Sequence, residues 1–362
     1  MSKIICTVTN DLVYDQRMIR ICNSLQKAGN EVILVGRQLK NSPELKPQNF
    51  RQHRVHCWFH TGPLFYFEMN IRLFFYVVGC NPHILNSADV DTVMAGLWYR
   101  KLTKFKWVFD AHEHFTEVPE VTDRKMVKAI WAWVELKVFK KAHSFYTVSA
   151  SIAEIFQKKY KKNVEVIRNV PLLRYKNVVK PQSDFSEKGF LIYQGALNEG
   201  RCIELYIKAM HQIEAQLVLV GEGDLSDQLR LLVSTEKLEH KVTFLGKISP
   251  GDLRHITQNA LMGLNVLENK GMSYYYSLSN KCFDYVHSFV PSISSNFPEY
   301  TRLNEEFEVM VLTEPTLEGV VNSIKELQSN QELYLRLQKN CQAAATKWNW
   351  EQEEIKLLAQ YE

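Results

Sequence analysis

The N-terminal part of the chain alternates between short apolar runs and segments in which apolar residues recur with helical spacing. Residues 4–8 are continuously apolar, as expected for a parallel strand that is buried on both faces. Apolar residues then follow a helical pattern from 18 to 25, Gly29 ends that pattern, and residues 31–36 form the next apolar run. This strand–helix–strand unit predicts the start of a doubly wound parallel sheet.

The alternation continues, stops at a polar segment and then starts again. Further strands of the first series are predicted over 54–58, 83–86, 106–110, 144–148 and 163–167. Residues 176–188 are polar, contain Pro181 and have no periodicity, which indicates a linker. The second series predicts strands over 189–193, 216–220, 242–245, 263–266, 291–294 and 309–312, with helices over 203–210 and 224–234. Residues 317–361 are predicted to be helical, with a break near 348–350.

These patterns predict an α/β protein with two Rossmann-like domains. We expect an N-terminal domain over 1–172, a linker over 173–188 and a C-terminal domain over 189–345. A final helix over 346–362 is expected to cross back and pack on the N-terminal domain. The two domains should face a central cleft, because ligands of open α/β sheets bind at the carboxyl ends of the strands.

Composition narrows the class of protein. The 362 residues are 46% apolar and 23% charged, which excludes a disordered or fibrous chain. A net charge of only +4 argues against a dedicated nucleic-acid-binding protein. The seven cysteines lack metal-ligand or redox spacing, and reduced thiols in a cytoplasmic protein are expected. No segment resembles a signal peptide or approaches the ~20 apolar residues of a membrane span.

The loop after the first strand lacks the motif of a common class of nucleotide-binding enzymes. Residues 9–17 contain no glycine-rich fingerprint, which argues against a nicotinamide or flavin enzyme. The chain has no P-loop sequence either.

Four motifs in chain order identify a family. Residues 108–113 read Val-Phe-Asp-Ala-His-Glu, and residues 193–201 read Tyr-Gln-Gly-Ala-Leu-Asn-Glu-Gly-Arg. Residues 218–223 read Val-Leu-Val-Gly-Glu-Gly, and residues 279–285 read Ser-Asn-Lys-Cys-Phe-Asp-Tyr. Together they resemble the glycosyltransferases of family 4, which have the GT-B fold, and the resemblance extends over nearly the whole chain.

The resemblance implies transfer of a hexose from a nucleotide-sugar donor, with retention at the anomeric carbon and without a metal or other cofactor. The acceptor would be a glycan or a lipid-linked glycan, as in polysaccharide biosynthesis. Arg201 and Lys281 would neutralise the donor diphosphate, and Asp284 would accept hydrogen bonds from the ribose. The full set of donor-binding residues would be Gly195, Arg201, Gly221, Glu222, Asn280, Lys281 and Asp284.

The acceptor side would lie in the N-terminal domain. His112 follows a strand between two acids, and the resemblance implies that it is the catalytic residue. The accompanying acceptor-side residues would be Asn10, Asp15, Arg17 and Glu113.

One departure from the family pattern keeps a second function open. Many members have a Glu-x7-Glu pair, whereas this chain has Tyr276 and Asp284 at those positions. Glu268 is the nearest acid upstream and is a candidate substitute. The alternatives are an active glycosyltransferase and a catalytically weak homologue that serves as a scaffold in a glycan-assembly complex. A nucleotide-sugar epimerase is less favoured, because no acid/base carboxylates can be placed for it.

Two groups of possible metal ligands occur in the sequence, but the sequence favours other roles for both. His112, Glu113, His114 and Glu117 lack a further strong ligand nearby. Asp89 and Asp91 form a D-x-D motif, which binds manganese in the GT-A fold. Here we expect it to cap the helix that begins near residue 92.

A basic and aromatic segment indicates contact with a membrane surface. Residues 124–143 contain six Lys or Arg and one Glu, interleaved with Trp and Ile. Residues 64–78 add several phenylalanines. Such a segment suits an anionic lipid surface, although core packing with a solvated basic face explains it equally well.

Overall fold

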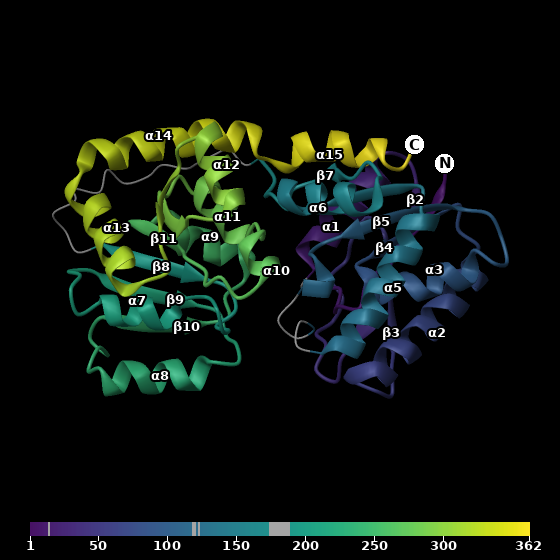
Figure 1. Ribbon diagram of the computed structural model, residues 1–362, viewed down its shortest axis with the longest axis horizontal. Helices are drawn as coiled ribbons and strands as arrows, with labels where there is room; N and C mark the ends of the chain where they lie inside the picture. Colours follow the sequence, from purple (N-terminus) through teal and green to yellow (C-terminus); the bar gives the residue numbers. More distant parts are fainter. Residues whose placement is uncertain (14, 118–120, 122–123, 174–188) are drawn as a thin grey trace. The chain divides into compact units, whose positions relative to one another are not determined.

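The computed structural model describes the chain except residues 14, 118–120, 122–123 and 174–188, so nearly all of the predicted linker lies outside the described residues. The chain divides into two compact units (Figure 1). Unit 1 comprises Met1–Asn169 and Gln352–Glu362, and unit 2 comprises Val170–Glu351.

Unit 1 is built on a seven-stranded parallel sheet with the order β3-β2-β1-β4-β5-β6-β7. Its strands are β1 (Lys3–Thr7), β2 (Glu31–Gln38), β3 (Arg51–His56), β4 (Ile84–Ala88), β5 (Lys106–Ala111), β6 (Ser144–Thr147) and β7 (Glu165–Val166). The connection reverses direction between β1 and β4, which creates a topological switch point at their carboxyl ends.

The helices of unit 1 pack on this sheet through their apolar faces. They are α1 (Gln16–Lys27), α2 (Gly62–Cys80), η1 (Val90–Thr92), α3 (Val93–Tyr99), η2 (Phe115–Glu117), α5 (Lys125–Lys141) and α6 (Ala150–Tyr160). α1 begins where Asp15 accepts a hydrogen bond from the backbone N–H of Met18, at 3.0 Å. α3 lies between α2 and α5 and contacts both.

The C-terminal segment completes unit 1. The last helix, α15, covers Trp350–Ala359. Beyond it, the Tyr361 hydroxyl lies 3.1 Å from that of Tyr146 and accepts a hydrogen bond from the Asn86 amide. Glu353 accepts a hydrogen bond from the backbone N–H of Arg168 at 3.1 Å. These contacts tie the end of the chain to the sheet of unit 1.

Unit 2 is also built on a parallel sheet, which has six strands in the order β10-β9-β8-β11-β12-β13. Its strands are β8 (Phe190–Gln194), β9 (Gln216–Val220), β10 (Val242–Gly246), β11 (Met262–Asn265), β12 (Ser292–Ser295) and β13 (Met310–Thr313). Its switch point lies between β8 and β11. The prediction of two Rossmann-like domains is therefore confirmed.

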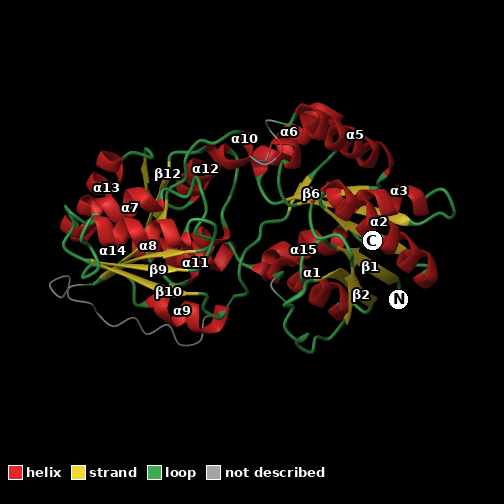
Figure 2. Cartoon of the chain, turned by 90° about the horizontal axis from the view of Figure 1, so that it is seen from below, coloured by secondary structure: helices red, strands yellow, loops and turns green. Residues whose placement is uncertain are grey.

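Helices cover both faces of the second sheet (Figure 2). They are α7 (Ile203–Ala209), α8 (Ser226–Thr235), α9 (Pro250–Gln258), α10 (Met272–Tyr275), α11 (Asn280–His287), α12 (Pro298–Glu306), α13 (Leu317–Ser329) and α14 (Gln331–Lys347). Residues of α7, α8, α13 and α14 share one apolar core with the strands, whereas α9 and α11 pack on the opposite face. The predicted helical break near 348–350 separates α14 from α15.

None of the seven cysteines, all of which lie in the described part of the chain, forms a disulfide, and six of them are buried. Within the described part of the chain, no helix combines the length and the hydrophobicity needed to cross a membrane.

Candidate functional site

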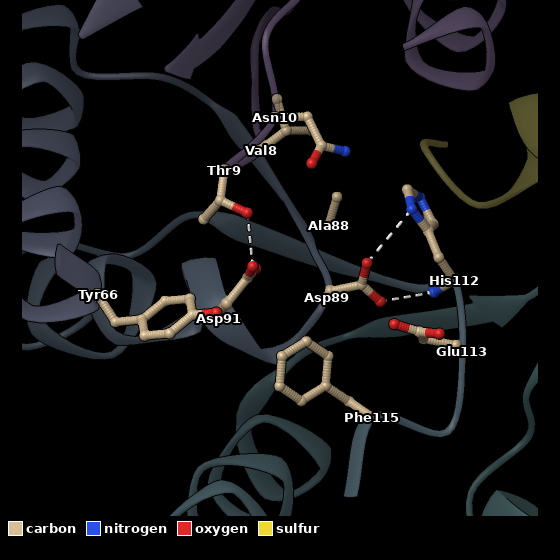
Figure 3. Close-up of a pocket in the computed structure, with 10 residues that line it drawn as sticks. All are labelled: Val8, Thr9, Asn10, Tyr66, Ala88, Asp89, Asp91, His112, Glu113 and Phe115. Atoms are coloured by element: carbon tan, nitrogen blue, oxygen red, sulfur yellow. Dashed lines mark hydrogen bonds and ion pairs between the residues drawn. The ribbon is translucent and has the colours of Figure 1, made fainter. Parts of the chain in front are cut away.

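A pocket of about 400 Å³ opens at the switch point of unit 1. Its walls come from the carboxyl ends of β1, β4 and β5, together with one residue of α2 (Figure 3). The lining residues are Val8, Thr9, Asn10, Tyr66, Ala88, Asp89, Asp91, His112, Glu113 and Phe115. The pocket thus lies where ligands of open α/β sheets bind.

His112 is held between two carboxylates. Its Nε2 lies 2.9 Å from Oδ2 of Asp110, and its Nδ1 lies 3.3 Å from Oδ2 of Asp89. Asp89 also accepts a hydrogen bond from the backbone N–H of His112, at 2.8 Å. With both ring nitrogens facing carboxylates, the imidazole is a double donor and is held in its charged form.

The surrounding charges shift three pKa values. Burial opposes the charged form of His112, but Asp110 and then Asp89 outweigh it and raise its pKa to about 9. Asp110 is also buried, yet Arg17 and His112 lower its pKa to about 2. Burial raises the pKa of Asp89 to about 8, despite the opposing effect of His112. His112 therefore carries a positive charge at neutral pH, with Asp110 as its main counter-ion.

The D-x-D motif does not cap a helix, so that prediction is wrong. Asp89 precedes η1 with φ 55° and ψ 168°, a conformation that favours glycine, and its carboxylate turns toward His112. Asp91 accepts a hydrogen bond from the hydroxyl of Thr9, at 2.6 Å (Figure 3). Contacts to other strands have replaced the local capping bond, which brings both carboxylates into the pocket wall.

The predicted acceptor-side residues fall into two groups. Asn10 and Glu113 line the pocket together with His112. Asp15 caps α1, and its other oxygen accepts a hydrogen bond from the amide of Asn10 at 3.3 Å. Arg17 is buried, pairs with Asp110 at 2.9 Å and donates to the carbonyl of Ile167. Asp15 and Arg17 thus do not line the pocket themselves. Asp15 contacts the lining residue Asn10, and Arg17 contacts Asp110, which in turn holds His112.

The alternative metal site at 112–117 is not assembled. His114 is buried with its ring edge-on to Phe156, and its Nε2 lies 3.3 Å from the hydroxyl of Thr116. Glu117 forms an ion pair with Lys128 at 2.6 Å. Across the described residues, no group of three or more His, Cys, Asp or Glu side chains is arranged to hold a metal ion.

Tight glycine turns shape the switch point of unit 2. Gly195 follows β8 with φ 134°, and Gly221 follows β9 with φ 132°. A Cβ atom at Gly221 would lie 1.9 Å from the carbonyl oxygen of Gly195, and one at Gly223 would lie 2.1 Å from Oδ1 of Asn198. Only glycine permits this close approach of the two loops, which leaves backbone exposed at the carboxyl edge of the sheet.

Lys281 and Arg201 form a cationic pair beside these loops. The Nζ of Lys281 lies 4.2 Å from the ring centre of Tyr193, and the Arg201 guanidinium lies 4.9 Å from that of Tyr274. Lys281 is 8% exposed, and neither cation has an ion pair with an acid among the described residues. Burial, and then the charge of Arg201, hold the pKa of Lys281 well below its usual range.

The N-terminus of α11 adds donors to the same place. The hydroxyl of Ser279, its N-cap residue, donates to Oδ1 of Asn265 and does not cap the helix. The backbone N–H of Cys282 donates to the carbonyl of Ser279 at 3.1 Å, whereas the helix offers no carbonyl to the N–H groups of Asn280 and Lys281 before it. The exposed Asn280 stands at the first position of α11. A helix N-terminus next to a buried lysine is suited to bind phosphate groups.

Two predicted donor residues have protein partners. Asp284 accepts a hydrogen bond at 3.1 Å from the amide of Gln194, whose own carbonyl oxygen accepts from Thr257. Glu222 pairs with Arg230 at 2.9 Å, beside the glycine turn after β9. Asp284 is thus held at the carboxyl end of β8 by a residue that sequence analysis missed.

The departure from the Glu-x7-Glu pattern is also visible in the structure. Tyr276 is the C-cap residue of α10, and its ring packs against that of Tyr275. Glu268 donates its backbone N–H to the carbonyl of Gly200 at 3.0 Å, and its carboxylate lies 3.1 Å from Lys270. Glu268 therefore lies next to the loop that carries Arg201, which keeps it a candidate substitute for the missing acid.

Comparisons with known proteins agree with this geometry. The model of Glycosyltransferase Family 4 matches residues 16–170, and that of Glycosyl transferases group 1 matches residues 176–344. Together they extend over nearly the whole chain. A comparison with curated protein sequences gave no match.

Several solved structures share the fold. A sucrose-phosphate synthase from Thermosynechococcus elongatus has a TM-score of 0.81 at 18% identity, covering 100% of this chain and 98% of that one. HepE from Anabaena, in complex with UDP and glucose, has a TM-score of 0.79 at 12% identity, covering 100% and 99%. WaaG, a glycosyltransferase involved in lipopolysaccharide biosynthesis, has a TM-score of 0.75 at 11% identity, covering 98% of both chains.

Both family models describe transferases, which favours an enzyme over the scaffold protein that the sequence left open. The two Rossmann-like units, the glycine loops and the matched models lead to one conclusion. The chain belongs to the family 4 glycosyltransferases of the GT-B fold and is a nucleotide-sugar-dependent hexosyltransferase.

Proposed function

We propose that unit 2 binds a uridine diphosphate sugar and that the hexose is transferred with retention, without a metal ion. The observation that carries this proposal is the buried Lys281 beside Arg201, without an acidic partner among the described residues. Two cations and the N-terminus of α11 offset the charge of a diphosphate. UDP is the nucleotide in the related HepE structure.

The leaving nucleotide gains negative charge as the glycosidic bond breaks. Cations that are already in place stabilise this charge without reorganisation, so they lower the barrier more than they tighten donor binding. Asp284, held by Gln194, would accept hydrogen bonds from the ribose. Retention is proposed from the family resemblance.

We propose that the pocket of unit 1 receives a glycan or lipid-linked acceptor, as in polysaccharide biosynthesis. Asn10, His112 and Glu113 line this pocket with hydrogen-bonding groups, and Tyr66 and Phe115 add aromatic rings. Polar groups beside aromatic rings suit a sugar ring, which has both hydroxyl groups and apolar C–H faces.

A surface next to this pocket supports association with anionic membranes from the cytoplasmic side. On α2, Glu68 and Arg72 are the charged residues and they pair with each other at 2.7 Å. Its outer side otherwise exposes large apolar side chains, among them Leu64, Phe67, Phe75 and Val78. A 19-residue helix with this exposed stripe has an unpartnered apolar face.

The start of α5 continues this surface. Met126, Ile130 and Trp133 are exposed there, close in the sequence to Arg124, Lys125 and Lys128. The other three basic residues of the predicted segment lie toward the end of α5. Trp131 contacts the rings of both Tyr66 and Phe115, at 5.1 and 5.2 Å between centroids. Because these two rings line the pocket, the exposed surface of α2 and α5 lies next to the pocket. Of the apolar residues of α5, only Val134, Val138 and Phe139 are buried, and the exposed ones favour a lipid surface.

A donor screen tests the proposed activity. Purified protein would be heated with UDP-, GDP- and ADP-hexoses, and a donor at a hundred times its dissociation constant should stabilise it by ~2.7 kcal/mol. Turnover would then be followed as release of the nucleoside diphosphate, in the presence of a glycan acceptor. Stabilisation by UDP-hexoses together with turnover supports the proposal, whereas binding without any turnover would favour the scaffold alternative.

A further inference from the structure

Arg37, near the end of β2, differs from three other arginines of unit 1 in having no acidic partner. Arg17, Arg54 and Arg72 each pair with a carboxylate, at 2.9, 2.7 and 2.7 Å. Among the described residues, Arg37 forms hydrogen bonds only to His60 and no ion pair with an acid. Because arginine keeps its charge in proteins, Arg37 is a cation that these residues do not neutralise.

The guanidinium of Arg37 is held in one orientation. Its Nη2 donates to the backbone carbonyl of His60 at 2.7 Å, and its plane lies over the ring of Phe65, 4.1 Å from the ring centre. Its Nε is buried without a hydrogen-bond partner, whereas Nη1 is neither buried nor bonded to a described residue. The two terminal nitrogens can therefore still donate to an oxyanion.

This guanidinium belongs to the border of the pocket of unit 1. The backbone N–H of Arg37 donates at 2.9 Å to the carbonyl of Asn10, which lines the pocket. A Cβ atom at Gly36 would lie 2.7 Å from the same carbonyl, so glycine permits this close approach. Phe65, under the guanidinium, has its ring centre 5.1 Å from that of the lining residue Tyr66.

The segment that Arg37 contacts also carries exposed apolar side chains. Trp58 and Phe59 are exposed in the loop before α2, and Leu64 is exposed in the first turn of that helix. Glu68 accepts the backbone N–H groups of Trp58 and Phe59, each at 2.9 Å, which holds the loop against α2. The cation thus lies between the pocket and the apolar surface of α2 and α5.

Three features follow one another along unit 1, namely a polar and aromatic pocket, an arginine and an apolar surface. A sugar joined to a lipid through phosphate has its chemical groups in the same order. A charge on the sugar ring itself would lie within the pocket, where the lining residues include no lysine or arginine. A charge between the sugar and the lipid would instead lie at the pocket border, beside Arg37.

We propose that Arg37 binds a phosphate group that joins the acceptor sugar to its lipid, so that the acceptor is a lipid phosphate- or diphosphate-linked sugar and not a neutral glycan. This inference rests on the proposed function, because it places the acceptor sugar in the pocket of unit 1. The planar fork of an arginine can donate two parallel hydrogen bonds to phosphate oxygens, and the contacts to His60 and Phe65 already orient it.

Matched citronellyl-linked sugars test the proposal by calorimetric titration of the full chain in the presence of UDP. Glucose, galactose, mannose and N-acetylglucosamine are each joined to the lipid directly, through phosphate and through diphosphate. At least one phosphate-linked form should bind about tenfold or more tightly than its direct glycoside, as expected for hydrogen bonds to charged groups. This advantage should shrink as the salt concentration rises.

Three variants locate the advantage. Arg37→Gln removes the charge and should reduce the advantage to about threefold or less, whereas Arg37→Lys keeps the charge without the fork and should retain part of it. Arg51→Gln is the matched control, because Arg51 lies at the opposite end of the paired strands β2 and β3. It should leave the advantage intact, and thermal unfolding checks that all variants fold.

Equal binding of direct and phosphate-linked sugars, or an advantage unchanged in Arg37→Gln, would overturn the proposal. Two further probes identify other anions. Dihexanoylphosphatidylglycerol bound as tightly through Arg37 would assign this residue to membrane headgroups, and octyl uronic acids bound in this way would assign it to an acidic sugar.

Titration with UDP and the variant Tyr66→Ala separate this inference from the proposed function. If UDP binds and Tyr66→Ala weakens the direct glycosides, the donor site and the acceptor pocket stand and only the phosphate contact is wrong. If UDP binds but no lipid-linked sugar of any form does, the acceptor assignment to unit 1 fails together with this inference.

Discussion

The guanidinium of Arg17 and the carboxylate of Asp110 form a buried ion pair, with Nη2 2.9 Å from Oδ1, although 93 residues separate them. The pair ties the first turn of α1 to the end of β5. The other oxygen of Asp110 lies 2.9 Å from Nε2 of His112. The position and charge of His112 therefore depend on an arginine that does not line the pocket.

We expect Arg17→Ala to lower the free energy of unfolding by ~3–5 kcal/mol, because it leaves Asp110 buried without its main partner. Arg51→Ala is the matched control, since Arg51 pairs with Glu31 at 3.5 Å on the surface and should cost at most ~1 kcal/mol. Chemical denaturation measures both. Equal losses of unfolding free energy in the two variants would show that the buried pair of Arg17 with Asp110 contributes no more than a surface ion pair.

The sequence predicted the strands and the order of the site motifs because both follow from local patterns. Asn10, His112 and Glu113 each directly follow a predicted strand, and parallel strands bring their carboxyl ends to one edge. Gly195, Gly221 and Lys281 came from the family resemblance, and the structure brings them to the corresponding edge of unit 2.

Long-range partners explain what the sequence did not predict. An arginine in a first helical turn is normally solvated, and nothing near Arg17 in the sequence indicates Asp110 as its partner. Asp89 matches a local capping pattern, but the contact with His112, 23 residues later, is made instead. Tyr66 lies in the aromatic segment 64–78, for which the sequence indicates a membrane surface or core packing, and only the fold brings it to the pocket.

The charge of His112 predicts how stability depends on pH. The pKa of His112 is raised to about 9 in the folded state. Its charge therefore contributes fully to the stability of the fold below about pH 6.5, the ordinary pKa of histidine, and this stabilisation is lost as the pH rises through 9. The free energy of unfolding should therefore fall between pH 6.5 and 9 in the wild type. The fall should be smaller in His112→Gln, as measured by urea denaturation at several pH values. Parallel curves for the two proteins would show that His112 is not charged as described.

We expect His112→Ala to reduce turnover by roughly 10²-fold or more while donor affinity stays within a factor of two or three. The reason is that His112 lies in unit 1, whereas the proposed donor site lies in unit 2. A group that acts mainly in the transition state affects kcat more than binding. Steady-state kinetics with a UDP-hexose and titration with UDP measure the two effects. Unchanged turnover would remove His112 from the catalytic machinery.

The surface of α2 and α5 should bind anionic vesicles. Each basic residue near the lipid contributes about 1 kcal/mol at low salt, and screening reduces this. Co-sedimentation is expected with vesicles that contain anionic lipid and not with neutral ones. Phe67→Ser with Phe75→Ser should weaken it, because both side chains are exposed, at 60% and 66%. Leu231→Ser is the control, since this exposed residue lies on α8 of unit 2. Equal sedimentation with both kinds of vesicle would assign the surface to another role.

The cations of unit 2 should hold the donor diphosphate without a metal. Arg201→Ala and Lys281→Ala should each weaken UDP binding by ~1.5–3 kcal/mol, the range for hydrogen bonds to charged groups, whereas uridine should bind nearly as before. EDTA should leave both UDP affinity and transfer intact. Because the pKa of Lys281 is low without an anion, UDP binding should also take up a proton where this lysine is neutral.

Calorimetric titration with UDP in buffers of different ionisation enthalpy measures this proton uptake. Lys281→Arg is the matched control, because an arginine stays charged and should bind UDP without taking up a proton. The affinity of the wild type for UDP should fall as the pH rises above the pKa of Lys281 in the free protein, and that of the arginine variant should fall less. Loss of transfer with EDTA, together with full activity of Arg201→Ala, would show that a metal ion and not these side chains neutralises the diphosphate.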